Sequence, residues 1–170
     1  MDFTLIVFRI LHIVLGVFWA GTLIFTAFFL IPSLREAGPD AAKVTAGLMK
    51  RKFLTVMPVV ALITILSGLW LYSKVSVGFQ PEYMRSKPGM AIGIGGLSAI
   101  VAFLIGVTVV RPSMLKAIAL SQGAASASPP DKEARLAEAA ALRVRAGKAG
   151  VVVALLLILT AGTMAIARFL

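Results

Sequence analysis

Residues 3–30 read FTLIVFRILHIVLGVFWAGTLIFTAFFL, an apolar run long enough to cross a bilayer as a helix. Two ionisable groups, Arg9 and His12, interrupt this run, and His12 is the only histidine of the chain. Ionisable side chains are rare within membrane spans and tend to mark functional sites. This stretch therefore predicts the fold class and also the place to look for a function.

The composition places the whole chain in the membrane class. Of its 170 residues, 59% are hydrophobic, whereas roughly half is typical of a soluble domain. The absence of cysteine excludes disulfides and thiolate metal sites, and a single histidine excludes a metal centre built from several imidazoles of one chain. Apart from Asp2 at the edge, no acidic residue lies within an apolar run, so a carboxylate proton relay has no candidates.

Four apolar segments predict an all-α, four-helix membrane bundle formed by a single domain, residues 1–170. The segments are about 3–30, 53–72, 89–110 and 150–170. Each reaches the roughly 20 residues that cross the hydrocarbon core. Backbone groups in lipid must hydrogen-bond internally, so helices are expected rather than strands. Pro32 is expected to close the first segment and Pro112 the third.

The basic residues lie mostly between these segments and predict the orientation. The connections 32–52 and 111–148 carry five and seven Lys or Arg residues, and the connection 73–88 carries three. Because strongly basic loops stay in the cytoplasm, both termini are expected outside, in the arrangement N-out and C-out. The net charge of +10 then reflects membrane topology, and no nucleic-acid partner is expected.

The connection 111–148 has an internal pattern. Residues 113–120 are expected to continue the third helix beyond the membrane, and SQGAASASPP (121–130) is a linker of small residues. Ser128 is a candidate N-cap with Pro129 at the first helical position, so 131–145 is expected to form a cytoplasmic helix that runs into the fourth span. Contact with solvent and headgroups, or docking of a partner, are its two expected roles.

Helical periodicity groups the unusual residues of the first span. At about 100° per residue, His12, Gly16 and Trp19 share one stripe, and Arg9 lies about 60° away. An imidazole beside a missing side chain and an indole would suit a flat macrocycle such as haem, which needs an axial ligand and close approach. Arg9 and Arg168 are expected near the outer surface, where they could pair with haem propionates.

Helix packing explains the same residues without a cofactor. Arg9 can extend to the interface along its own stem. His12 can hydrogen-bond a neighbouring helix, and Gly16 with Ala20 forms a pair of small residues that permits close packing. Both interpretations of the stripe remain open.

Two further patterns lie on the third span. Gly89, Gly93 and Gly96 form one stripe, expected to pack against another helix or to line a cofactor pocket. Met84 and Met90 flank the outer end of this span. Thioethers suit copper(I), which makes a copper site an alternative.

Several stretches together resemble known families. They are LHI (11–13) followed by Trp19, MKRKF (49–53) followed by Pro58, SGLWL (67–71), and MAIARFL (164–170). In order and spacing the first three resemble HemJ-type protoporphyrinogen oxidases and small bacterial CopD-like (copper resistance protein D) membrane proteins. The last resembles the tail of the CopD-like branch.

The resemblance implies a haem b site in a bacterial inner membrane protein. His12 matches an axial ligand of the HemJ-like group, and Lys87, at the entry of the third span, matches a lysine implicated with it. The second axial position would fall to Lys87, a methionine, water, or His12 of a second subunit. The implied function is electron transfer or quinone-linked oxidoreduction, in a homo-oligomer or a larger complex.

The sequence thus yields two hypotheses. In the first, haem b is bound by six residues: His12, Arg9, Gly16, Trp19, Lys87 and Arg168. In the second, the chain is a non-catalytic accessory subunit of a larger membrane complex, or a copper-handling membrane protein.

Overall fold

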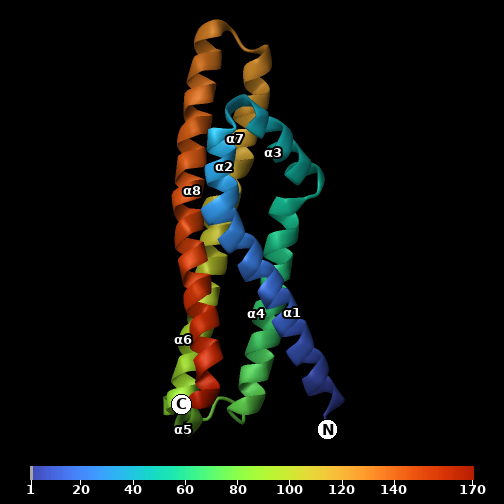
Figure 1. Ribbon diagram of the computed structural model, residues 1–170, viewed down its shortest axis with the longest axis vertical. Helices are drawn as coiled ribbons and strands as arrows, with labels where there is room; N and C mark the ends of the chain where they lie inside the picture. Colours follow the sequence, from blue (N-terminus) through green and yellow to red (C-terminus); the bar gives the residue numbers. More distant parts are fainter. Residues whose placement is uncertain (1) are drawn as a thin grey trace.

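The structure is a computed structural model that describes residues 2–170, and every regular element in that range is a helix (Figure 1). Four helical stretches are long and apolar enough to cross a membrane. They are Phe3–Glu36, Phe53–Val75, Lys87–Ser126 and Pro129–Phe169. The predicted all-α membrane bundle is therefore confirmed, and the apolar helices indicate a lipid bilayer around it.

The first stretch does not end at Pro32 as predicted. It runs from α1 (Phe3–Phe25) through a π-helical turn, η1 (Thr26–Leu30), into α2 (Ile31–Glu36). Proline has no N–H, and its ring clashes with the carbonyl four residues earlier. The π turn moves the hydrogen bonding one residue further, since the Ile31 N–H donates to the Thr26 carbonyl. The helix thereby absorbs the proline and continues.

The third stretch repeats this arrangement. Here α6 (Lys87–Ile105) passes through the π-helical turn η3 (Gly106–Val110) into α7 (Arg111–Gly123). The Arg111 N–H donates to the Gly106 carbonyl directly before Pro112. The predicted continuation over 113–120 is thus confirmed.

The fourth stretch joins the predicted cytoplasmic helix and the fourth span in one helix, α8 (Pro129–Ile166), followed by the 3₁₀ turn η5 (Ala167–Phe169). Ser128 occupies the N-cap position as predicted, although its hydroxyl donates to the Asp131 carboxylate at 2.6 Å. The first half of α8 packs against α7, and this hairpin extends beyond the rest of the molecule (Figure 1).

The remaining elements connect the spans at the two ends. The end of the bundle away from both termini carries η2 (Gly38–Asp40), α3 (Ala41–Lys50) and η4 (Ala124–Ser126), whereas α5 (Pro81–Arg85) lies between α4 (Phe53–Val75) and α6 (Figure 1). Figure 1 shows α5 and both termini at the end opposite to α2, α3 and the hairpin. The two more basic connections therefore lie at one end of the bundle, and both termini lie at the other (Figure 1).

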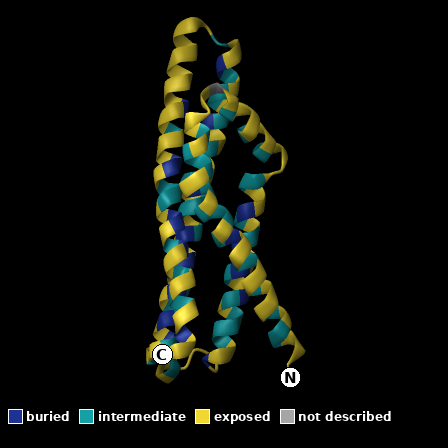
Figure 2. Ribbon diagram, in the orientation of Figure 1, coloured by how far each residue is buried: buried dark blue, intermediate teal, exposed yellow. Residues whose placement is uncertain are grey.

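Small residues fill the seams between the helices, and large apolar residues face outward (Figure 2). On α6 the buried residues Ala91, Gly95, Ser98 and Ala102 recur at helical spacing. This pattern is the usual one in membranes, where close backbone approach drives helix association and lipid covers the large side chains.

The predicted glycine stripe packs against another helix at Gly93, whose added Cβ would lie 3.7 Å from the Tyr72 hydroxyl oxygen of α4, but not at Gly96. A Cβ added at Gly96 would meet nothing within 4 Å, whereas one at Gly95 would lie 2.6 Å from the Thr163 hydroxyl oxygen. Gly89 abuts the backbone of the α5–α6 turn rather than a span. The close contact between α6 and α8 therefore depends on Gly95, which the sequence pattern of Gly89, Gly93 and Gly96 did not include.

Candidate functional site

The His12 imidazole lies between α1 and α4. Its Nδ1 atom is 2.8 Å from the Thr64 carbonyl oxygen of α4. A carbonyl oxygen can only accept, so Nδ1 carries the proton and donates it. This bond links two spans that are 52 residues apart in the chain, and it explains how α4 accommodates the polar side chain of α1.

The local sequence of α4 makes the Thr64 carbonyl a shared acceptor. The Ser67 hydroxyl donates to the same carbonyl at 3.0 Å and lies 3.5 Å from Nδ1 of His12. Carbonyl oxygens have two lone pairs and can accept from more than one donor. Thr64 and Ser67 are both buried, so this polar group sits inside the interface rather than at its rim.

A glycine of α4 makes room for the ring. A Cβ added at Gly68 would lie 2.5 Å from Cε1 and 2.9 Å from Nδ1 of His12. Gly16, which the sequence places beside His12, faces Thr64 instead, with its added Cβ 3.5 Å from the threonine methyl group. Gly16 therefore allows the helices to approach, whereas Gly68 gives the imidazole its place.

The second ring nitrogen of His12, Nε2, is not fully buried. It makes no hydrogen bond to residues 2–170, and no fully buried side-chain nitrogen or oxygen in that range lacks a partner. Nε2 therefore reaches the surface of the chain. With the proton on Nδ1, Nε2 carries a lone pair, which is the state in which imidazole ligates metals.

An aromatic pair joins α1 and α4 one turn before His12. Phe8, one turn before His12, packs on Trp70 of α4 with ring centroids 4.2 Å apart. The Lys74 ammonium lies 5.3 Å from the centroid of the Trp70 ring. Phe8 and Thr64 were missed by sequence reasoning, although Phe8 lies at helical spacing from His12 and Thr64 one turn before Gly68.

Trp19 and Arg9 lie in contrasting environments. Trp19 is only 3% exposed and packs in the centre of the bundle against Ala61, Ala102 and Leu157. Arg9 is exposed and makes no hydrogen bond or ion pair within residues 2–170. The Arg9 guanidinium is thus available to pair with an anionic group, and it lies on the same helix as His12, about one turn nearer the N-terminus.

Lys87 and Arg168 lie in a different part of the bundle, at the end that carries both termini (Figure 1). Lys87 is the first residue of α6, and η5, which carries Arg168, packs against α6. The main contacts of α1 are with α4 and α8, and its first residues diverge from α6 and the C-terminus, with α4 between them (Figure 1). Arg9 thus lies on the same helix as His12, whereas Lys87 and Arg168 belong to two other elements, α6 and η5, that pack together.

A metal site built from several carboxylates or imidazoles does not occur within residues 2–170, because no three His, Cys, Asp or Glu residues cluster there. Met84 and Met90 are both exposed, at 41% and 49%. His12 is thus the one candidate imidazole ligand. No protein-family model, curated protein or solved structure matches the chain.

Proposed function

We propose that this protein binds haem b in the bacterial inner membrane and acts in electron transfer or quinone-linked oxidoreduction, with Nε2 of His12 as an axial ligand. The hydrogen bond from Nδ1 to the Thr64 carbonyl supports the proposal most directly. Histidines that ligate metals usually donate their other ring nitrogen to a carbonyl or carboxylate, which fixes the tautomer and the ring orientation. His12 has that arrangement, with Nε2 left free.

The residues around His12 fit one face of a haem. The apolar surface of α1 and the Phe8–Trp70 pair would contact the edge of the macrocycle, and Arg9 would pair with a propionate. Haem, when bound, supplies one-electron transfer. The chain's own residues orient the ligand, neutralise the propionate and keep water away from the ring.

The second axial ligand would come from a second copy of the chain. Nε2 makes no hydrogen bond to residues 2–170, and Lys87 begins α6, whereas the main contacts of α1 are with α4 and α8. A neighbouring subunit could supply its own His12 or Lys87, with Arg168 at the same outer level. The haem would then lie between subunits, which agrees with a homo-oligomer.

Spectroscopy of two His12 variants tests the proposal. The purified wild-type protein, expressed with ample haem, should show a Soret band and sharp α and β bands on reduction. His12→Asn can still donate a hydrogen bond from near the position of Nδ1 but has no Nε2. We expect His12→Asn and His12→Ala to lose these bands, and His12→Asn to keep more of the wild-type stability. A colourless wild-type protein would refute haem binding, and bands retained in both variants would refute the ligand assignment.

The alternative is a non-catalytic subunit in which His12 serves packing alone. The observation in its favour is the same hydrogen bond, because an interhelical donor needs nothing from Nε2. Under this alternative, His12→Asn would leave the absorption spectrum of the protein and its association with a larger complex unchanged.

A further inference from the structure

A polar groove lies at the point where the α7–α8 hairpin leaves the bundle. It has a volume of about 260 Å³. Its lining residues are Thr108, Pro112, Ser113, Lys116, Leu142 and Arg145. The first four share one face of the η3–α7 segment, and the last two lie one turn apart on α8.

Ser113 gives this groove an unused hydrogen-bond donor. The residue is 6% exposed, and its hydroxyl makes no hydrogen bond to residues 2–170. Helical serines and threonines often donate to the carbonyl four residues earlier. Thr108 does so with Leu104 at 2.7 Å, and Ser121 with Ala117 at 2.8 Å. Because no fully buried polar atom in the described range lacks a partner, the Ser113 hydroxyl opens into the groove that it lines.

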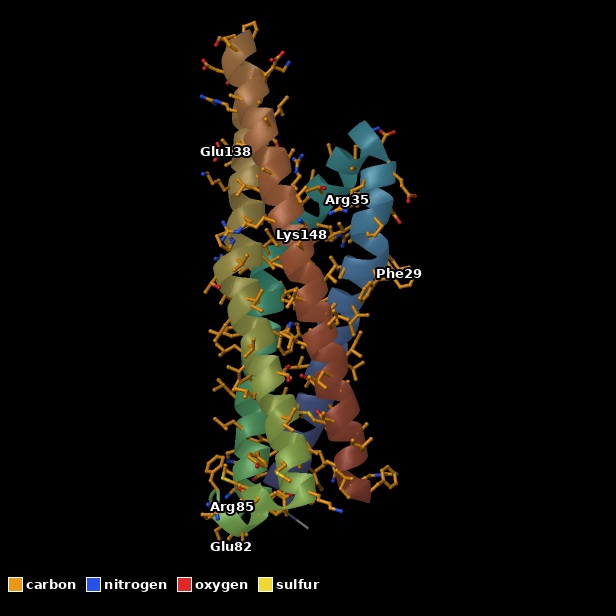
Figure 3. The ribbon with its side chains drawn as sticks, turned by 90° about the vertical axis from the view of Figure 1, so that its left-hand side faces the viewer. Phe29, Arg35, Glu82, Arg85, Glu138 and Lys148 are labelled. Carbon is orange, nitrogen blue, oxygen red and sulfur yellow. The ribbon has the colours of Figure 1, made fainter. Side chains whose placement is uncertain are left out.

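Two cations accompany this hydroxyl. Arg145 makes no hydrogen bond or ion pair within residues 2–170, although Arg135 and Arg143 of the same helix both hydrogen-bond to the α7–η4 segment. Lys116 pairs with Glu138 at 2.6 Å, one turn further from the spans. Its ammonium has three donors, so the ion pair leaves two of them free. The charged residues that line the groove, Lys116 and Arg145, are both cationic. Glu138 lies further from the spans along α8 than Lys148 does (Figure 3).

The depth of the groove matches the inner headgroup layer. At about 1.5 Å per residue, the helix from Lys87 to Thr108 is about 32 Å long. Measured the same way back from Arg168, Arg145 lies about 35 Å along α8. The hydrocarbon core is about 30 Å thick, so both helices place the groove just beyond it.

Arginine from a second element reaches α8 at nearly the same level. A Cβ added at Gly147 would lie 2.9 Å from a terminal nitrogen of Arg35, and Figure 3 shows Arg35 of α2 beside Lys148 of α8. Arg35 therefore adds positive charge at the level of the groove but on the opposite face of α8, because Gly147 lies about 200° round the helix from Arg145.

We propose that this groove binds the phosphate of an anionic phospholipid of the inner leaflet. Arg145 and Lys116 neutralise the phosphate, and the buried Ser113 hydroxyl donates to one of its oxygens. Pro112 and Leu142 supply the apolar part of the lining. Basic pockets between helices on the cytoplasmic side are suited to anionic headgroups.

Native mass spectrometry of the full chain released from detergent tests the proposal, with phosphatidylglycerol and phosphatidylcholine titrated separately. Arg145→Gln should weaken phosphatidylglycerol binding about fivefold, as expected for one cation near a headgroup. Ser113→Ala changes no charge and should still weaken binding, by about threefold or more. Lys132→Gln removes one charge from the exposed first turn of α8 and should leave binding unchanged.

The outcomes separate a built site from general surface charge. The proposal would be overturned if Arg145→Gln and Lys132→Gln lost the same affinity for phosphatidylglycerol while Ser113→Ala bound it as the wild type does. Equal binding of phosphatidylcholine, or displacement of phosphatidylglycerol by millimolar inorganic phosphate, would overturn the assignment to an anionic lipid. Circular dichroism and the melting temperature verify that each variant is folded, and Ser113→Ala, which only removes a hydroxyl, keeps the test available if Arg145→Gln is unstable.

Discussion

The substitution Gly68→Ala tests whether the His12 ring lies where the structure places it. The new Cβ would lie 2.5 Å from Cε1 of His12, whereas carbon atoms in contact prefer about 3.5–4.0 Å. The ring or the whole of α1 must therefore move by about 1 Å. Either movement breaks the 2.8 Å hydrogen bond from Nδ1 to the Thr64 carbonyl.

The size of the effect follows from three contributions. Interhelical hydrogen bonds in membranes contribute about 0.6 kcal/mol on average and up to about 1.7 kcal/mol. Overpacking costs about 1–3 kcal/mol. In an unobstructed helix the change from glycine to alanine would instead stabilise by about 0.5–1 kcal/mol. We therefore expect Gly68→Ala to lower the free energy of unfolding by about 1–3 kcal/mol.

Reversible unfolding in mixed micelles, followed by circular dichroism, measures this difference. Gly21→Ala is the matched control, because an added Cβ at Gly21 meets nothing within 4 Å. In the His12→Ala background the obstructing ring is gone, so the penalty of Gly68→Ala should disappear and a double-mutant cycle should give a coupling of about 1 kcal/mol or more. If Gly68→Ala stabilises the wild-type protein as much as Gly21→Ala does, the reasoning about the His12 site is refuted.

Three further predictions concern packing, a proline and the orientation. Gly95→Ala should destabilise the bundle by about 1–3 kcal/mol, because the added Cβ would meet α8. Gly96→Ala, on the open side of α6, should not destabilise it. Thermal unfolding in detergent compares the two variants. The Nε–H of Arg111 donates at 3.0 Å to the Leu54 carbonyl, which has no helical donor because Pro58, four residues later, lacks an N–H. Arg111→Ala should therefore lower the free energy of unfolding by about 1–3 kcal/mol in the wild type. In a Pro58→Ala background the loss should be markedly smaller. Because the chain lacks cysteine, Ser128→Cys provides a single thiol at the tip of the hairpin; an impermeant maleimide should label it in inverted vesicles and not in intact cells, and the reverse result would contradict the orientation with both termini outside.

The spans were predictable because hydropathy and length alone determine them. The helix ends were not, since the rule that proline stops a helix neglects a π turn before it. Thr26–Leu30 and Gly106–Val110 both provide such a turn, and the helices pass through Pro32 and Pro112. At Pro58 the compensation comes from a distant arginine, which no local pattern could reveal.

The site was predictable to the extent that it depends on one helix. A lone imidazole in an apolar span identified His12, but the partner carbonyl belongs to α4 and is a backbone atom without a residue-type signature. The glycine that accommodates the ring is Gly68 rather than Gly16, because the position of the notch depends on how α1 crosses α4. Spacing within one helix cannot supply that crossing.

Binding of the proposed haem to His12 would be coupled to self-association of the chain. Nδ1 is hydrogen-bonded within the chain, and Nε2 has no hydrogen-bond partner in residues 2–170. If Nε2 ligates haem, the chain offers one imidazole, and a second imidazole would have to come from another copy. If a second copy provides it, haem binds the dimer and not the monomer, so haem stabilises the dimer by mass action and dilution in detergent weakens haem retention. A small bundle with a single histidine can in this way form a two-ligand haem site, because twofold symmetry supplies the second imidazole.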